Sequence, residues 1–124
     1  SLHTLAHDWN KPDGAEALSR WDRFMAEQLS YFLDRMSESK EDETSLLDNS
    51  VVLYGSSNST THNNRNYPLV LAGGGELGLD HGQYRRFDEK IPMSNLLLTM
   101  LHCVGSEQES FSDSTNNLTD ILQS

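Results

Sequence analysis

The chain has little positive charge and no long hydrophobic run. It contains 9 lysine and arginine residues against 19 aspartate and glutamate residues, which gives a formal net charge of -10 over 124 residues. A protein that binds nucleic acid or an anionic membrane surface needs a surplus of lysine and arginine, so we expect neither as a partner. The apolar stretches are too short to span a bilayer, and the sequence shows no signal peptide.

Cysteine is almost absent as well. The single cysteine, Cys103, excludes a disulfide within the chain, and its place in an apolar stretch favours a buried structural thiol over a reactive one. A chain of this length forms at most one domain with a modest core. Because the sequence opens on Ser1 and not on methionine, we expect a single α/β domain, or a domain fragment, that belongs to a longer polypeptide.

Two segments have the apolar periodicity of amphipathic helices. Between Ala15 and Met36, apolar residues recur every three or four positions, which predicts a helix over this range. A second helix is predicted over 93–104, because Pro92 suits the first position of a helix and Gly105 suits its end.

Two short apolar runs, Val51–Tyr54 and Leu69–Ala72, predict strands that are buried on both faces. Tyr84–Phe87 predicts a short edge strand. With helices covering the sheet, these elements indicate a three-layer α/β arrangement, or half of one. The predicted core is drawn from all of these elements and consists of Trp21, Phe24, Phe32, Leu53, Val70, Leu97 and Leu101.

The connecting segments have three different compositions. Residues 37–45 are acidic and lack the glycine and alternating ligands of an EF-hand loop, so they predict a solvated linker. The run Gly73–Gly75 predicts a flexible turn, because the glycine patterns of nucleotide-binding loops are absent. From about 106 to 124 we expect a loosely held tail, in which Leu118, Ile121 and Leu122 dock as a last turn.

The first candidate ligands lie near the N-terminus. His3 and His7 are four residues apart, so a helix would place both imidazoles on one face. With Asp8 they supply the nitrogen and oxygen donors that are usual in zinc sites. Two solvated surface histidines explain the same spacing, so the spacing alone leaves both interpretations open.

The polar loop between the two predicted strands supplies the second half of the candidate site. Long loops at the ends of buried strands are where α/β proteins place their chemistry. In this loop His62 is a candidate metal ligand, and the hydroxyl and amide side chains are candidates for binding a substrate. These residues are Ser56, Ser57, Asn58 and Asn64.

Five segments carry a family resemblance in collinear order. They are HTLAHDWN at 3–10, LLDNSVVLYGSSNS at 46–59, HNNRNYPLVLAGGG at 62–75, MSNLLLTMLHCVG at 93–105 and ESFSDST at 109–115. With them the chain resembles the C-terminal part of the HXXSHH-domain proteins, bacterial proteins of unknown function that are frequent in planctomycetes. That family is similar in turn to the alkaline-phosphatase-like α/β hydrolases, which use two metal ions to act on phosphate or sulfate esters.

The resemblance implies the C-terminal portion of an alkaline-phosphatase-like three-layer sandwich, in an exported (periplasmic or extracellular) protein. It implies a divalent metal ion, which would be zinc, manganese or calcium, and a small anionic ester or glycan as ligand. The implied metal ligands are His3, His7, Asp8 and His62, and the implied substrate-binding residues are Ser56, Asn58 and Asn64. No catalytic residue is assigned, because the nucleophile of those hydrolases would lie in the other half of the fold.

The chain departs from the family pattern at several positions. Ala6 replaces the serine of the H-x-x-S-H-H motif, and Asp8 replaces its last histidine. Asn64 stands where the loop pattern H-x-H-x-N-x-P has a second histidine, and a neutral amide is a poor zinc ligand. Gly55-Ser56-Ser57 occupies the place of an acid–histidine pair. Two hypotheses therefore stand, a metal-dependent ester hydrolase and a non-catalytic ligand-binding or structural domain.

Overall fold

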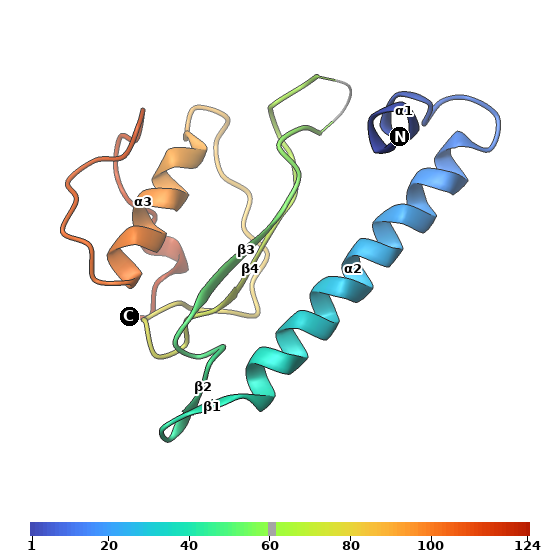
Figure 1. The fold of residues 1–124 in the computed structure, drawn as a ribbon. Helices are drawn as coiled ribbons and strands as arrows, with labels where there is room; N and C mark the ends of the chain where they lie inside the picture. The colour runs from blue at the N-terminus through green and yellow to red at the C-terminus, as the bar shows by residue number, and fades with distance from the viewer. Residues whose placement is uncertain (60–61) are drawn as a thin grey trace.

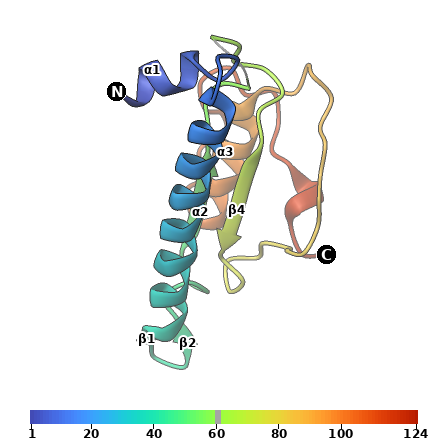
Figure 2. The ribbon, with the colours of Figure 1, turned by 90° about the vertical axis from the view of Figure 1, so that its right-hand side faces the viewer.

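The computed structural model describes residues 1–59 and 62–124 and has a mixed α/β fold (Figure 1). Its sheets are two antiparallel pairs of strands, and the β3–β4 pair lies between the helices α2 and α3 (Figures 1 and 2). The elements in chain order are α1 (Leu2–His7), α2 (Gly14–Glu38), β1 (Lys40–Glu41), β2 (Thr44–Ser45), β3 (Val51–Gly55), β4 (Leu69–Gly73), α3 (Met93–Cys103) and the 3-10 turn η1 (Thr119–Ile121).

Both predicted long helices are confirmed, with small changes at their ends. The first begins at Gly14, where a Cβ atom would lie 1.8 Å from the carbonyl oxygen of Asp8. Only glycine therefore allows α1 and α2 to meet this closely. The second helix, α3, follows Pro92 as predicted and ends at Cys103. No helix in the described part of the chain has both the length and the apolar character needed to cross a membrane.

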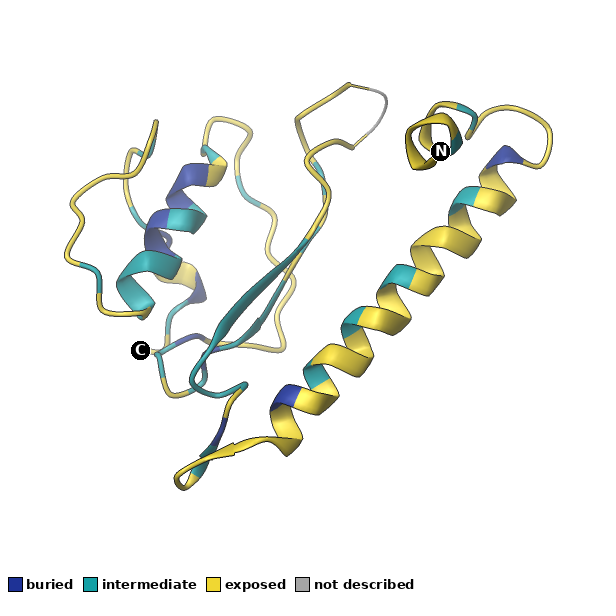
Figure 3. Ribbon diagram, in the orientation of Figure 1, coloured by how far each residue is buried: buried dark blue, intermediate teal, exposed yellow. Residues whose placement is uncertain are grey.

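Much of the predicted core on α2 is exposed, which corrects the sequence-based expectation. Trp21, Phe24 and Phe32 are 36%, 48% and 49% exposed, and Val70 on β4 is exposed too (Figure 3). The main contacts of α2 are with α1 at one end and β2 at the other, so the middle of its apolar stripe is left uncovered. The other three predicted core residues, Leu53, Leu97 and Leu101, are half-buried.

The acidic segment after α2 is not a structureless linker. The helix continues to Glu38, and the chain then forms the small β1–β2 ladder. A turn follows in which the backbone N–H and the hydroxyl of Ser45 both donate to one carboxylate oxygen of Asp48, at 2.9 and 2.6 Å. These hydrogen bonds favour the charged carboxylate and lower the pKa of Asp48 below its ordinary value.

The two predicted strands are confirmed, but they are not central strands of a larger sheet. They pair with each other from Val51↔Gly73 to Gly55↔Leu69, and their side chains are half-buried or exposed rather than buried on both faces. Among the described residues no further strand joins this pair. The predicted edge strand over 84–87 is wrong, because this segment is irregular; its Phe87 packs against the core, while the neighbouring side chains are exposed.

The triple glycine Gly73–Gly75 forms a tight turn at the end of β4. Gly73 and Gly74 have positive φ angles of 76° and 71°, which favour glycine. A Cβ atom on Gly73 would lie 2.3 Å from the carbonyl oxygen of Ser50. The glycines therefore serve the close approach of backbone to backbone at the end of the strand pair.

The core lies between the strand pair, α3 and the C-terminal tail. Its buried apolar cluster consists of Leu79, Leu118 and Ile121. The tail is held more firmly than its polar composition suggests, because the buried Thr99 hydroxyl accepts the backbone N–H of Leu118 at 2.7 Å. The side-chain oxygen of Asn95 likewise accepts a backbone N–H from the tail, that of Thr115 at 2.8 Å.

Candidate functional site

The helix α1 places two of the predicted ligands side by side. Its N-cap is Ser1, whose hydroxyl accepts the backbone N–H of Thr4 at 3.2 Å. This cap starts the helix two residues before His3 and puts His3 and His7 one turn apart. The centroids of their imidazole rings are 4.5 Å apart, and both side chains are exposed.

The loop between β3 and β4 brings a third imidazole to this pair. Figures 1 and 2 both place α1 at the same end of the molecule as this loop. The ring centroid of His62 lies 5.1 Å from that of His7 and 6.4 Å from that of His3. His62 has a positive φ of 56°, a backbone conformation that is uncommon for a residue with a side chain. The structure thus brings together three of the four predicted metal ligands.

Two of the three distances between the imidazole rings are close to those expected in a zinc site. A zinc ion lies about 2.0–2.1 Å from each imidazole nitrogen, which puts the centroids of two tetrahedral ligands about 5 Å apart. The His3–His7 and His7–His62 spacings are close to this value, whereas the His3–His62 spacing is wider. Consistent with that wider pair, no group of three or more His, Cys, Asp or Glu side chains within residues 1–59 and 62–124 is arranged to hold a metal ion.

The third, wider spacing is between exposed side chains. All three imidazoles lie on the surface, so a change of rotamer would break no core packing. The donors also suit the ion, because imidazole nitrogen is among the commonest zinc ligands. The three histidines therefore fit a divalent transition metal in chemistry, and two of the three pairs fit it in spacing.

Asp8, the fourth predicted ligand, is engaged elsewhere. Its carboxylate pairs with the ammonium group of Lys11 at 2.7 Å. It also lines a shallow hollow between α1 and the beginning of α2, together with Ser1 and Thr4. Asp8 is the C-cap residue directly after His7, so its side chain leaves the helix about 100° around the axis from that of His7. The cluster is thus formed by imidazoles without a described carboxylate beside them.

The predicted substrate-binding residues bond mainly within their own loop. The hydroxyl of Ser56 accepts the backbone N–H of Asn58 at 3.1 Å, and the amide of Asn58 donates to the hydroxyl of Ser57 at 3.3 Å. Asn64 lies instead on the wall of a cavity on the α3 side of the strand pair. All of these side chains are exposed, so their oxygen and nitrogen atoms are accessible to a ligand.

The remaining histidines and the cysteine have structural surroundings. His81 is within hydrogen-bonding distance of the carbonyl oxygen of Gly73, and His102 lies 2.7 Å from that of Gln108. Partial burial raises the pKa of the Cys103 thiol. This direction opposes formation of the thiolate and agrees with a structural thiol.

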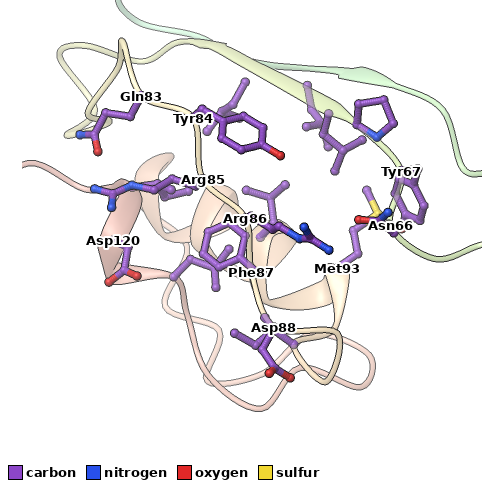
Figure 4. Close-up of a pocket in the computed structure, with 18 of the residues that line it drawn as sticks. Asn66, Tyr67, Gln83, Tyr84, Arg85, Arg86, Phe87, Asp88, Met93 and Asp120 are labelled. Atoms are coloured by element: carbon purple, nitrogen blue, oxygen red, sulfur yellow. Dashed lines mark hydrogen bonds between the residues drawn. The ribbon is translucent and has the colours of Figure 1, made fainter. Parts of the chain in front are cut away.

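The cavity beside α3 is the feature that sequence reasoning missed. It is bounded by the strand pair, by α3 and by residues 80–92, which we call the strap because they cross from β4 to α3 (Figure 4). A signal was present in the sequence, since Tyr84-Arg85-Arg86-Phe87 alternates aromatic and cationic residues. That run predicts an edge strand, and its pattern alone does not indicate a ligand site.

In comparisons with known proteins, no family model, curated protein or solved structure matches this chain. The resemblance to the HXXSHH-domain proteins therefore rests on the five sequence segments alone.

Proposed function

We propose that this chain is the metal-holding part of an HXXSHH-type protein with an alkaline-phosphatase-like architecture. It would bind a divalent ion through His3, His7 and His62 and, through that ion, an anionic ester or glycan. The supporting observation is the convergence of three imidazoles from two segments that are far apart in the sequence. Helical spacing explains why His3 and His7 lie close together, but it does not explain why His62 lies beside them.

The donor set favours one kind of ion. Calcium takes oxygen ligands, whereas imidazole suits zinc and other transition metals, so zinc is the first candidate. Three protein ligands leave a coordination position for an oxygen of a phosphate or sulfate group, whose charge the ion would neutralise. That neutralisation matters in a chain with a net charge of -10, which repels anions at long range.

Binding without hydrolysis is the second candidate function. It is favoured by the absence of a described carboxylate beside the three rings, since Asp8 pairs with Lys11. Asn64 and the Gly55-Ser56-Ser57 run likewise stand where the active relatives are expected to have ionisable ligands. In this reading the histidines would hold an ion that anchors an acidic or sulfated glycan.

Zinc titration by calorimetry tests the shared part of both candidates. We expect one zinc ion per chain at neutral pH. His7→Ala and His62→Ala should each weaken binding by about tenfold or more, because each loses one of three nitrogen ligands. His81→Ala is the matched control and should bind zinc like the unmodified chain, because His81 lies at a different carbonyl. Unchanged zinc binding by His62→Ala would contradict the proposal.

Ester hydrolysis then separates the two candidates. Zinc-dependent hydrolysis of 4-nitrophenyl phosphate or 4-nitrophenyl sulfate that is lost in His62→Ala would support an enzyme. Zinc binding without any turnover of either ester would support the non-catalytic domain.

A further inference from the structure

The cavity on the α3 side of the strand pair has the size of a ligand site. Its volume is about 750 Å³, which falls within the roughly 300–1,000 Å³ that is usual for pockets that bind small molecules. No residue of α1 lines it, and its walls come from the strand pair, the loop residues 64–68, the strap, α3 and the tail (Figure 4).

The floor of the cavity is apolar and continuous with the core. Leu71, Phe87 and Leu96 line it and are packed against the buried core residues while remaining partly accessible. Leu53 adds a second side chain from the strand pair. An apolar or aromatic group that enters here would be removed from water against these side chains, which is the main source of affinity for small ligands.

One end of the cavity carries a cationic group. Arg86 is exposed, extends from the strap into the cavity, and points toward the end formed by Asn66 and Tyr67 (Figure 4). Within the described residues its guanidinium forms no salt bridge. At the same end the hydroxyl of Tyr67 donates to the sulfur of Met93 at 3.1 Å, which joins the loop to the start of α3.

Four carboxylates also line the cavity, those of Asp80, Asp88, Glu89 and Asp120. Figure 4 shows Asp88 and Asp120 on the sides away from Asn66 and Tyr67. The carboxylate of Asp88 accepts the backbone N–H of Lys90 at 2.9 Å, and that of Asp80 accepts the amide of Gln83. The end at Arg86 and Asn66 therefore carries a guanidinium and an amide, whereas the Asp120 side carries a carboxylate together with the guanidinium of Arg85 (Figure 4); Arg65 also lines the cavity.

We propose that this cavity binds a small organic anion with an aromatic or apolar body. The anionic group would lie at Arg86 and Asn66, where the planar guanidinium can donate two hydrogen bonds to a carboxylate, sulfate or phosphate. The body would lie on Phe87 and the leucines of the floor, and the ring of Tyr84, which is 88% exposed, would cover it. The net negative charge of the chain opposes this binding only weakly, because salt screens distant charges beyond about 8 Å.

This site is independent of the metal proposal. It uses none of the three clustered histidines; Asn66 comes from the loop that carries His62, but the cationic group and the aromatic cover come from the strap. A cavity this open could also bind apolar molecules without regard to charge, so the decisive property is discrimination between an anion and its neutral counterpart.

The experiment compares two probes of the same shape, 2-naphthalenesulfonate and 2-naphthol, by fluorescence titration. We expect the sulfonate to bind more tightly to the unmodified chain. Arg86→Gln should weaken sulfonate binding by about tenfold, the loss of one charge-assisted interaction, and leave 2-naphthol binding unchanged. Tyr84→Ala should weaken the binding of both probes, because it removes the aromatic cover. Both side chains are exposed, so both variants should keep the fold.

Two further variants serve as controls. Arg35→Gln removes the same charge from α2, outside the cavity, and should bind both probes like the unmodified chain. His62→Ala should also bind both probes like the unmodified chain, which would show that the cavity and the histidine cluster are different sites. The proposal is overturned if 2-naphthol binds as tightly as the sulfonate, if neither probe binds at millimolar concentration, or if Arg86→Gln leaves sulfonate binding unchanged.

Discussion

The arm formed by α1 and α2 and the body formed by residues 46–124 are stabilised in different ways. All four salt bridges among the described residues lie in the arm, between side chains that are largely exposed. In the arm's two helices, only Gly14 and Met36 are buried. The body has no salt bridge among its described residues, but it has a buried apolar cluster and buried polar side chains that bind the tail. Since exposed ion pairs contribute little to stability, the body should determine the stability of the chain.

The candidate metal site joins these two regions. His3 and His7 belong to the arm, and His62 belongs to the body. Under the proposed function, a bound ion would link the weakly packed arm to the firmly packed body. Zinc should then stabilise the arrangement of the two regions in addition to filling the site.

The largest effect is expected from Asn95→Ala in the body. The Asn95 side-chain oxygen accepts the backbone N–H of Thr115, and its amide donates to the Thr115 hydroxyl at 3.2 Å. Removing these bonds leaves partly buried groups of the tail unpaired, so urea denaturation should show a loss of about 2–3 kcal/mol in the free energy of unfolding. Asn116→Ala, an exposed neighbour, is the control and should change it by less than about 0.5 kcal/mol. Equal losses in the two variants would contradict this account of the body.

A somewhat smaller loss is expected from Thr99→Val. Thr99 is fully buried, and its hydroxyl donates to the carbonyl of Asn95 at 2.8 Å while accepting the N–H of Leu118. Valine keeps the shape of the side chain but leaves the N–H of Leu118 unpaired. Urea denaturation should therefore show a loss of about 1–2 kcal/mol in the free energy of unfolding. The exposed Thr119→Val serves as the matched control. If Thr99→Val is as stable as the unmodified chain, the hydroxyl does not hold the tail.

A pH-dependent effect is expected at the turn between the arm and the body. The Ser45 hydrogen bonds lower the pKa of Asp48, so the folded state binds this proton less readily than the unfolded state. The stabilisation of the folded state by the charged Asp48 carboxylate is therefore complete above the ordinary aspartate pKa of about 4. It is lost as the pH falls through the lowered pKa. The difference in urea midpoint between the unmodified chain and Asp48→Asn should shrink below this pH. A difference that stays constant down to strongly acidic pH would show that the charge is not responsible.

The smallest effect is expected from an ion pair of the arm. The guanidinium of Arg35 lies 2.6 Å from the carboxylate of Glu38, but both side chains are more than half exposed. Arg35→Gln should leave the urea midpoint unchanged within error, because solvent screens such pairs. A shift as large as that of Thr99→Val would mean that the charges of the arm contribute to stability, which would contradict the claim that the body determines it.

The sequence predicted the local elements well because their signals are local. Apolar periodicity located α2 and α3, and the apolar runs located β3 and β4. What covers an apolar face depends on the rest of the fold, which is why Trp21 and Phe32 were predicted as core but are exposed. The strand predicted over 84–87 failed for the same reason, since a strand needs a partner that its own residues do not specify.

The candidate site was predictable in part. Helical spacing placed His3 and His7 on one face of α1, and the same geometry turns Asp8 away from them. The approach of His62 depends on how the loop meets α1, which no local pattern determines. The cavity under the strap was missed because it is formed by segments from four parts of the chain.

The most direct test of the metal proposal follows the imidazole nitrogens by NMR during a zinc titration. The chain has five histidines, of which His81 and His102 lie against backbone carbonyls. The proposal predicts that the signals of His3, His7 and His62 shift together and saturate at one zinc ion per chain, while those of His81 and His102 stay in place. If the His62 signals stay unchanged while those of His3 and His7 move, or if all five shift without saturation, the three-histidine site does not exist.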